Sequence, residues 1–155
     1  MNLKEALERR GVKVVMTRTT NDVNLSNSER ARIANRAKAD LFVRVHGDGS
    51  PDSSTAGITT LYPGKTKWTA ATSEPSRRAA QLVHRAVVAQ TGAADRGVVA
   101  RTDLSGFNYA VVPSILIECG FLSNPVEDKL LSSPHYQDKL AEGMAKGIVR
   151  YLESR

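Results

Sequence analysis

The sequence predicts an α/β fold, a three-layer α/β/α sandwich around a largely parallel sheet, in one domain over residues 1–155. Short apolar runs alternate with amphipathic segments of helical period, which is the pattern of βαβ units. The runs are apolar throughout, as expected for strands that are covered on both faces. A chain of 155 residues with 41% hydrophobic and 25% charged residues is also long and apolar enough for one core.

The first third of the chain is predicted to alternate helix and strand. Apolar residues recur at helical spacing over residues 2–10, and Gly11 follows where a C-cap glycine belongs. Val12–Thr17 reads as a short, mostly buried strand. After a polar loop, Ser26 and Glu29 form a capping box that begins a helix extending to about residue 39.

The middle of the chain continues the alternation. Leu41–His46 is a second apolar strand, which ends at a glycine-rich turn, and Gly57–Tyr62 is a third. A loop over residues 63–76 precedes a helix from Ser73 to about Thr91, whose apolar residues lie on one face. A short strand is expected near Val98–Ala100.

The last third supplies one more strand and two helices. Ser114–Glu118 is apolar until it meets a carboxylate. Asn124 and Pro125 are typical of a helix start with proline at the first helical position. Ser133 precedes the last helix, whose apolar stripe consists of Tyr136, Leu140, Met144, Ile148 and Leu152.

Charge and composition exclude several function classes. Lys and Arg total 22 against 16 Asp and Glu, a net charge of +6, which favours a polyanionic partner or marks a merely basic domain. Nucleic-acid binding is disfavoured because the charge is dispersed and aromatic residues are only 5%. No apolar stretch approaches about 18 residues and no apolar region follows Met1, so neither a membrane span nor a signal peptide is predicted. One cysteine, Cys119, excludes an internal disulfide.

Two polar side chains end apolar strands. His46 closes one strand and Glu118 closes another. Ligands of α/β sheets bind outside the carboxyl ends of the strands, so both residues are expected at one cleft. A histidine in a tight turn and a glutamate in an ion pair are the structural alternatives. An imidazole and a carboxylate that face one cleft suit a metal ligand and a general acid/base.

Five segments, which cover the chain from about Val12 to its end, carry a family resemblance. They are Val14–Arg18, Glu29–Asn35, Asp40–His46, Gly57–Tyr62 and Ile117–Pro125. The last contains Glu-x-Gly-Phe-x-Ser-Asn-Pro, which is specific by itself. In this order they resemble the zinc-dependent N-acetylmuramoyl-L-alanine amidases of the amidase 3 class, which are peptidoglycan hydrolases.

The resemblance implies a fold, a cofactor and a reaction. The fold would have a six-stranded sheet with one zinc ion. The reaction would be hydrolysis of the amide between the lactyl group of N-acetylmuramic acid and L-alanine, in the cell wall, outside the cell or in the periplasm. His46 matches a zinc ligand and Glu118 matches the glutamate that activates the zinc-bound water. Trp68, Arg44 and Asp48 are further candidates for binding the peptidoglycan substrate.

The chain departs from the family at its start. The family's first strand, with a Gly-His-Gly-Gly zinc ligand, is not found, and Glu5 lies too late in its helix to match the glutamate ligand. Three explanations stay open. The chain is an N-terminally truncated amidase domain, a non-catalytic peptidoglycan-binding or regulatory module, or a domain with another metal arrangement that uses His84 or His135.

Four predictions concern side chains and loops outside this pair. The loops 48–56 and 63–76 should rim the cleft, with Trp68 stacking on a sugar or covering a small satellite core. Cys119 should point into the core as a buried, unreactive thiol. His84 is predicted to be exposed, because it is offset from the apolar face of its helix. His135, in the first turn of the last helix, is not expected to act.

Overall fold

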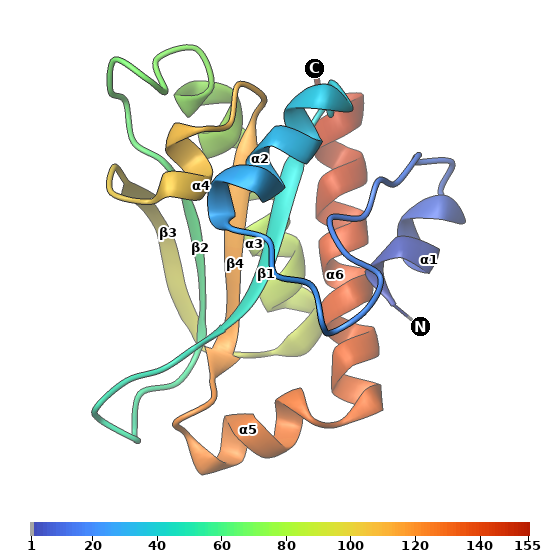
Figure 1. Ribbon diagram of the computed structural model, residues 1–155. Helices are drawn as coiled ribbons and strands as arrows, with labels where there is room; N and C mark the ends of the chain where they lie inside the picture. The colour runs from blue at the N-terminus through green and yellow to red at the C-terminus, as the bar shows by residue number, and fades with distance from the viewer. Residues whose placement is uncertain (1) are drawn as a thin grey trace.

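Four strands form one sheet in the computed structural model, which describes residues 2–155 (Figure 1). The strands are β1 (Phe42–Asp48), β2 (Ile58–Pro63), β3 (Asp95–Arg101) and β4 (Ser114–Phe121), in the spatial order β1-β4-β2-β3. The β1–β4 and β2–β3 pairs are parallel, whereas β2 and β4 are antiparallel. The predicted α/β fold is confirmed, with one antiparallel pairing at the centre of its sheet.

Six helices accompany the sheet. They are α1 (Leu3–Glu8), α2 (Asn27–Arg36), α3 (Ser73–Thr91), α4 (Ser105–Asn108), α5 (Pro125–Leu131) and α6 (Pro134–Glu153). The capping box that begins α2 is present, because the Ser26 side chain accepts from Glu29 N–H and Glu29 bonds back to Ser26. Asn124 is the N-cap of α5 and Pro125 is its first residue, as predicted from the sequence.

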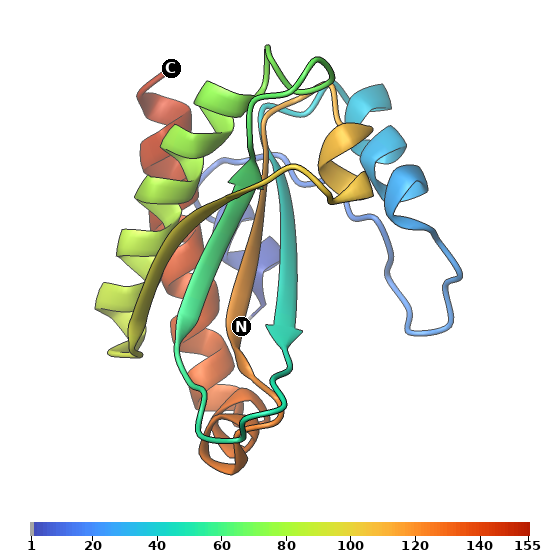
Figure 2. The same cartoon turned by 90° about the vertical axis from the view of Figure 1, so that its left-hand side faces the viewer.

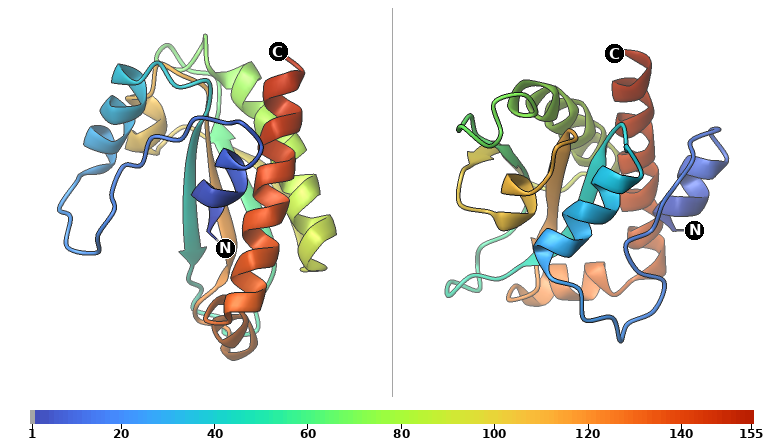
Figure 3. Two further views of the ribbon diagram at one scale, coloured as in Figure 1. Left: turned by 90° about the vertical axis from the view of Figure 1, so that its right-hand side faces the viewer. Right: turned by 45° about the horizontal axis from the view of Figure 1, so that its top comes forward.

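One face of the sheet is covered by α3 and α6, which lie side by side (Figure 2). The main core lies between them and the sheet and includes Ile115 and Ile117 of β4. Gly143 lets the two helices approach closely, because a Cβ there would lie 2.8 Å from the Cα of Val87. Helix α1 packs against α6, and its residues Ala6 and Leu7 join the main core (Figure 3).

The other face is covered only at one end, where α2 and α4 lie (Figure 2). A small cluster of Leu61, Phe107 and Leu116 packs under α4, and Phe42 packs with Ala31 of α2. The helices therefore flank both faces of an open sheet, and the uncovered part of this second face is where a ligand would reach the strands.

The prediction of a strand over Val12–Thr17 is wrong. This segment has no strand assignment, and Val15 and Met16 are about half exposed, although Val12 and Val14 pack partly against the core. A strand requires a hydrogen-bonded neighbour, and among residues 2–155 no strand pairs with this segment. β1 is accordingly one edge of the sheet.

Candidate functional site

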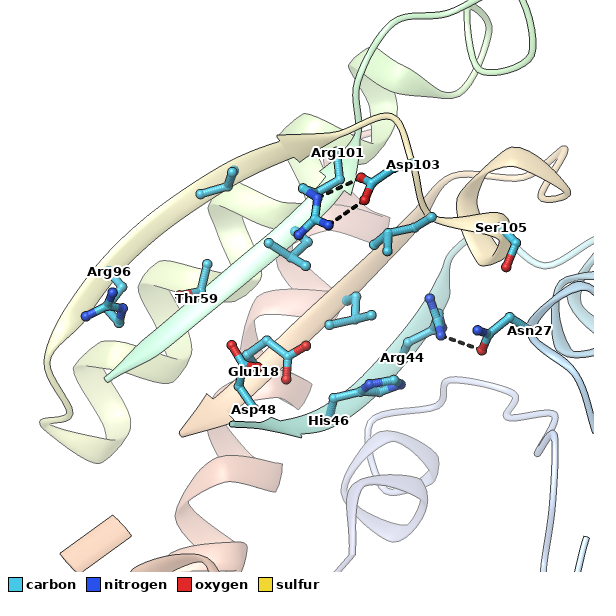
Figure 4. A pocket seen from close by; sticks show the side chains of 14 residues that line it. Asn27, Arg44, His46, Asp48, Thr59, Arg96, Arg101, Asp103, Ser105 and Glu118 are labelled. Atoms are coloured by element: carbon cyan, nitrogen blue, oxygen red, sulfur yellow. Dashed lines mark hydrogen bonds and ion pairs between the residues drawn. The ribbon is translucent and has the colours of Figure 1, made fainter. Parts of the chain in front are cut away.

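A groove of about 680 Å³ runs along the open face of the sheet (Figure 4). All four strands contribute to it, together with the first residue of α2 and the segment that leads into α4. The lining residues are Asn27, Arg44, His46, Asp48, Thr59, Leu61, Arg96, Val99, Arg101, Asp103, Leu104, Ser105, Leu116 and Glu118. The groove is polar and rich in ionisable side chains, as expected for a ligand site at the uncovered part of an α/β sheet.

His46 and Glu118 meet at one end of this groove. They are register partners in the parallel β1–β4 pair, and both side chains line the groove. Figure 4 shows them close together with Asp48 at the same end. The prediction that His46 and Glu118 lie at one edge of the sheet and face one cleft is confirmed, although β1 and β4 continue two and three residues beyond them.

The position of Glu118 depends on the turn that follows it. Glu127, at the start of α5, accepts hydrogen bonds from Phe121 N–H at 2.7 Å and from Gly57 N–H at 2.8 Å. Gly120 has φ = 146°, in the region that glycine adopts readily, and a Cβ there would lie 3.1 Å from Glu127 Oε2. The Glu-x-Gly-Phe segment thus ties the end of β4 to the loop before β2 and holds the strand that carries Glu118.

Glu118 has the electrostatics of an acid/base group. Burial, followed by the charge of Asp48, raises the pKa of Glu118 to about 7, while Arg44 acts in the opposite direction. Its Oε2 atom is buried and has no hydrogen-bond partner in the described part of the chain. A carboxyl whose pKa is near neutrality exchanges a proton readily, and an unpartnered buried oxygen is free to do so with a ligand.

His46 is held in its neutral form. Loss of solvent at the groove, followed by the charges of Arg44 and Arg30, lowers the pKa of His46, and Asp48 acts in the opposite direction. A neutral imidazole is the form that binds a metal ion.

The metal-ligating groups of the described residues are fewer than a catalytic zinc requires. Residues 2–155 contain no group of three His, Cys, Asp or Glu placed to hold a metal ion. A catalytic zinc normally takes three protein ligands. His46, Asp48 and Glu118 therefore do not by themselves form a complete zinc site.

The arginines of the groove differ in their partners. Arg101 forms a two-pronged ion pair with Asp103, with N···O distances of 2.8 and 2.6 Å. Arg96 stacks on the ring of Phe121. Arg44 is buried and donates from Nη2 to the Asn27 Oδ1 atom at 2.7 Å. Arg96, Arg101 and Asn27 line the groove but were not predicted from the sequence as site residues. A firm assignment of β3 and of its direction could have pointed to the two arginines.

The other candidate residues differ in whether they reach the groove. Trp68 is 67% exposed beside Lys67 and is not among the lining residues, so a contact with substrate stays a prediction. Asp48, the last residue of β1, lines the groove, but no other residue of 48–56 and none of 63–76 is among its lining residues, so the prediction that these two loops rim the cleft is wrong. Cys119 is buried in the core, and burial raises the pKa of its thiol to about 12, as predicted for an unreactive cysteine.

The prediction that His84 is exposed is wrong. His84 is 2% exposed, its Nδ1 lies 3.0 Å from Thr60 Oγ1 and its Nε2 lies 2.8 Å from Asp95 Oδ1. The helical pattern predicted exposure because it does not report polar partners on other elements. Thr60 on β2 and Asp95 on β3 accommodate the buried imidazole on the face of the sheet opposite the groove. Both ring nitrogens of His84 have hydrogen-bond partners, which leaves neither for a metal ion. His135 is exposed on α6.

Comparisons with known proteins show which family this chain resembles. The family model described as N-acetylmuramoyl-L-alanine amidase, amidase 3, matches residues 1–150. The amidase LytC of Bacillus subtilis is 33% identical over 141 residues, which are 91% of this chain and 27% of LytC. The germination-specific amidase of the same organism is 28% identical over 169 residues, covering 99% of this chain and 67% of the relative. This chain thus spans about a quarter of one relative and two thirds of the other.

Solved structures show the same fold. The crystal structure of an N-acetylmuramoyl-L-alanine amidase from Clostridium difficile 630 superposes with a TM-score of 0.88 at 34% sequence identity. The match covers 99% of this chain and 79% of that one. Ami1 of Mycobacterium smegmatis also superposes with a TM-score of 0.88, at 31% identity, over 99% of this chain and 73% of its own.

Proposed function

The chain belongs to the amidase 3 family of N-acetylmuramoyl-L-alanine amidases, and we propose that it hydrolyses the amide between the lactyl group of N-acetylmuramic acid and L-alanine in peptidoglycan. The observation that carries the proposal is the pair His46 and Glu118, register partners that face one groove, with Glu118 Oε2 unpartnered. The relatives named as amidases indicate the reaction, and the groove supplies an acid/base group for it.

Glu118 would move the proton in this reaction. Its carboxylate accepts a proton as a water oxygen attacks the carbonyl carbon, and the same proton then passes to the amide nitrogen as the C–N bond breaks. The products are the lactyl carboxylic acid and a peptide with a free L-alanine amine. A pKa of about 7 suits both halves of this transfer, because both protonation states of Glu118 are populated near neutral pH.

Zinc dependence is a separate part of the proposal. His46 is the residue that would serve as a ligand, since its pKa is lowered and its ring faces the groove. No group of three donors is found within residues 2–155. The remaining zinc ligands would therefore have to come from elsewhere.

A second candidate function is binding without hydrolysis. The small number of metal donors in residues 2–155 favours it over catalysis by this chain alone. Either function places the protein at the cell wall or in the periplasm, where its substrate lies. No helix within residues 2–155 has the length and apolar character to cross a bilayer.

The test is digestion of purified peptidoglycan with and without added zinc, with the zinc content of the protein measured by elemental analysis. The proposal expects peptides with a new N-terminal alanine in the mass spectrum and none with Glu118→Gln. His46→Ala should lose zinc and activity, whereas Glu118→Gln should lose activity alone. Binding to peptidoglycan with no release of peptide in any zinc concentration contradicts hydrolysis and supports the second candidate.

A further inference from the structure

One charge in the groove lacks a counter-ion. Arg44 is only 7% exposed, and its single hydrogen bond within residues 2–155 is the one that Nη2 donates to Asn27. A guanidinium carries five N–H donors, and no carboxylate forms an ion pair with this one in the described chain. Burial of a charge is costly unless an opposite charge compensates it.

Arg44 is one of the side chains that line the groove. Figure 4 shows the guanidinium beside Asn27 at the α2 end of the groove. The guanidinium lies against Gly106 of α4, where a Cβ would stand 2.6 Å from Nη1. The absence of a side chain at position 106 thus makes room for the guanidinium, and its hydrogen bond to Asn27 orients it.

The neighbouring arginines make this one distinct. Arg101 is already paired with Asp103, and Arg96 stacks on Phe121. Among these three arginines of the described chain, only Arg44 combines burial and close packing against Gly106 with the lack of an ion pair, and the charge of Glu118 acts on it without forming one. These are the properties of an anion-binding side chain.

We propose that Arg44 binds a free carboxylate on the peptide side of the substrate, on the residue that follows the L-alanine. The proposal rests on the proposed function, which places the scissile amide at His46 and Glu118. Arg44 is two residues before His46 on the same face of β1, a separation of about 7 Å in a strand. An extended peptide covers that distance in about two residues.

The charge on the second residue of the stem peptide then decides how tightly a substrate binds. In a stem peptide whose second residue is a glutamate linked through its side chain, the α-carboxylate is free and reaches Arg44. When that carboxyl is amidated the charge is lost, and Arg44 stays buried without a counter-ion. A planar guanidinium favours a carboxylate through paired hydrogen bonds, so the protein should prefer the acid form.

The experiment compares two synthetic dipeptides of L-alanine and D-glutamate whose γ-carboxyl is blocked as a methylamide, one with a free α-carboxylate and one with its α-carboxyl amidated. Their dissociation constants for the 155-residue protein are measured by calorimetry. The acid should bind at least about tenfold more tightly than the amide. Arg44→Gln should bring the ratio of the two constants close to one.

Asn27→Asp is the sharper variant because it does not remove Arg44. The new carboxylate stands at the 2.7 Å contact and supplies the missing counter-ion, so the acid preference should fall about tenfold while the melting temperature stays equal or rises. Asn24→Asp, the same chemical change three residues earlier and outside the groove lining, is the matched control and should keep the preference.

Several outcomes overturn the proposal. They are equal binding of acid and amide by the unaltered protein, no measurable binding of either, or a preference that survives both Arg44→Gln and Asn27→Asp. Inorganic phosphate that competes as strongly as the acid peptide would show anion binding without selection of a peptide carboxylate. Hydrolysis of peptidoglycan is measured separately. A protein that prefers the acid peptide but releases no peptide from peptidoglycan supports the role of Arg44 and contradicts the amidase proposal. A protein that hydrolyses peptidoglycan but binds acid and amide equally supports the amidase proposal and contradicts the role of Arg44.

Discussion

His84 and His46 lie on opposite faces of the same sheet and have opposite surroundings. His84 belongs to α3 and is buried between this helix and the sheet, with a polar partner at each ring nitrogen, Thr60 and Asp95. His46 lies in the groove, where no hydrogen bond of its ring is found within residues 2–155 and where Glu118 Oε2 is also without a partner. The covered face satisfies its imidazole, and the open face keeps bonding capacity for a ligand.

The comparison separates stability from function. A buried polar group that is fully hydrogen-bonded contributes to the fold, and removal of it leaves its partners unpaired. A polar group that stays unsatisfied at a groove costs stability and is retained for what it binds. The variants below test whether the two faces divide in this way.

The largest effect is expected from His84→Ala. It removes a buried ring and two hydrogen bonds, so the free energy of unfolding should fall by about 2–4 kcal/mol. His46→Ala is the matched change on the open face and should cost less than about 1 kcal/mol, because that side chain is exposed. Urea denaturation of both variants checks this, and equal losses would refute the division between the faces.

Gly147→Ala tests the packing beneath the covered face. A Cβ at this position would collide with the backbone of Val83 on α3, so the two helices must separate. Overpacking of this kind should cost about 1–3 kcal/mol of unfolding free energy. Gly49→Ala, where an added Cβ meets nothing within 4 Å, should leave the melting temperature nearly unchanged.

Glu118 should make the stability of the metal-free protein depend on pH. Its pKa is about 7 in the fold against 4.5 ordinarily, so the folded state binds the proton more tightly than the unfolded state. The contribution of Glu118 to the free energy of unfolding is therefore fully present below pH 4.5, and this contribution is lost as the pH rises to about 7. The loss should be on the order of 1 kcal/mol, once solvent screening of a partly exposed carboxyl is allowed for.

Glu118→Gln removes this titration and supplies the control. The variant should be more stable than the unaltered protein at pH 8 and similar to it at pH 4, as measured by denaturation at both values. A parallel pH dependence in the two proteins would show that Glu118 does not titrate as described. Asp48→Asn should bring the pKa of Glu118 down, because the charge of Asp48 raises it.

The smallest effect is expected for Asp103→Ala. The Arg101–Asp103 pair is solvent-exposed, so its loss should change the free energy of unfolding by less than about 0.5 kcal/mol, measured by urea denaturation. A loss comparable to that of His84→Ala would mean that the open face also carries a structural polar network.

Much of the fold follows from local patterns. The capping box at Ser26, the apolar run that precedes Glu118 and the proline start after Asn124 each depend on residues a few positions apart. The sequence also placed His46 and Glu118 at one cleft, because parallel strands carry their carboxyl ends to the same edge.

The errors concern partners that are distant in the chain. Val12–Thr17 has the composition of a strand, but strand formation requires a neighbour, and no neighbouring strand in residues 2–155 pairs with it. His84 looked exposed because helical periodicity reports only its own helix, whereas Thr60 and Asp95 come from other strands. The antiparallel β2–β4 pairing also involves two distant segments.

The α/β class, the helix starts, the family and the two polar residues of the candidate site could be read from the sequence, since they depend on local periodicity and on short motifs. The pairing of the charges in the groove could not be read in this way, because most of the partners are distant in the chain. Arg44, Arg96 and Arg101 are alike as letters in the sequence. Asp103 stands only two residues from Arg101, whereas folding is needed to bring Phe121 to Arg96 and Asn27 to Arg44. Compensation depends on distances between side chains from different elements, and those distances exist only once the chain has folded.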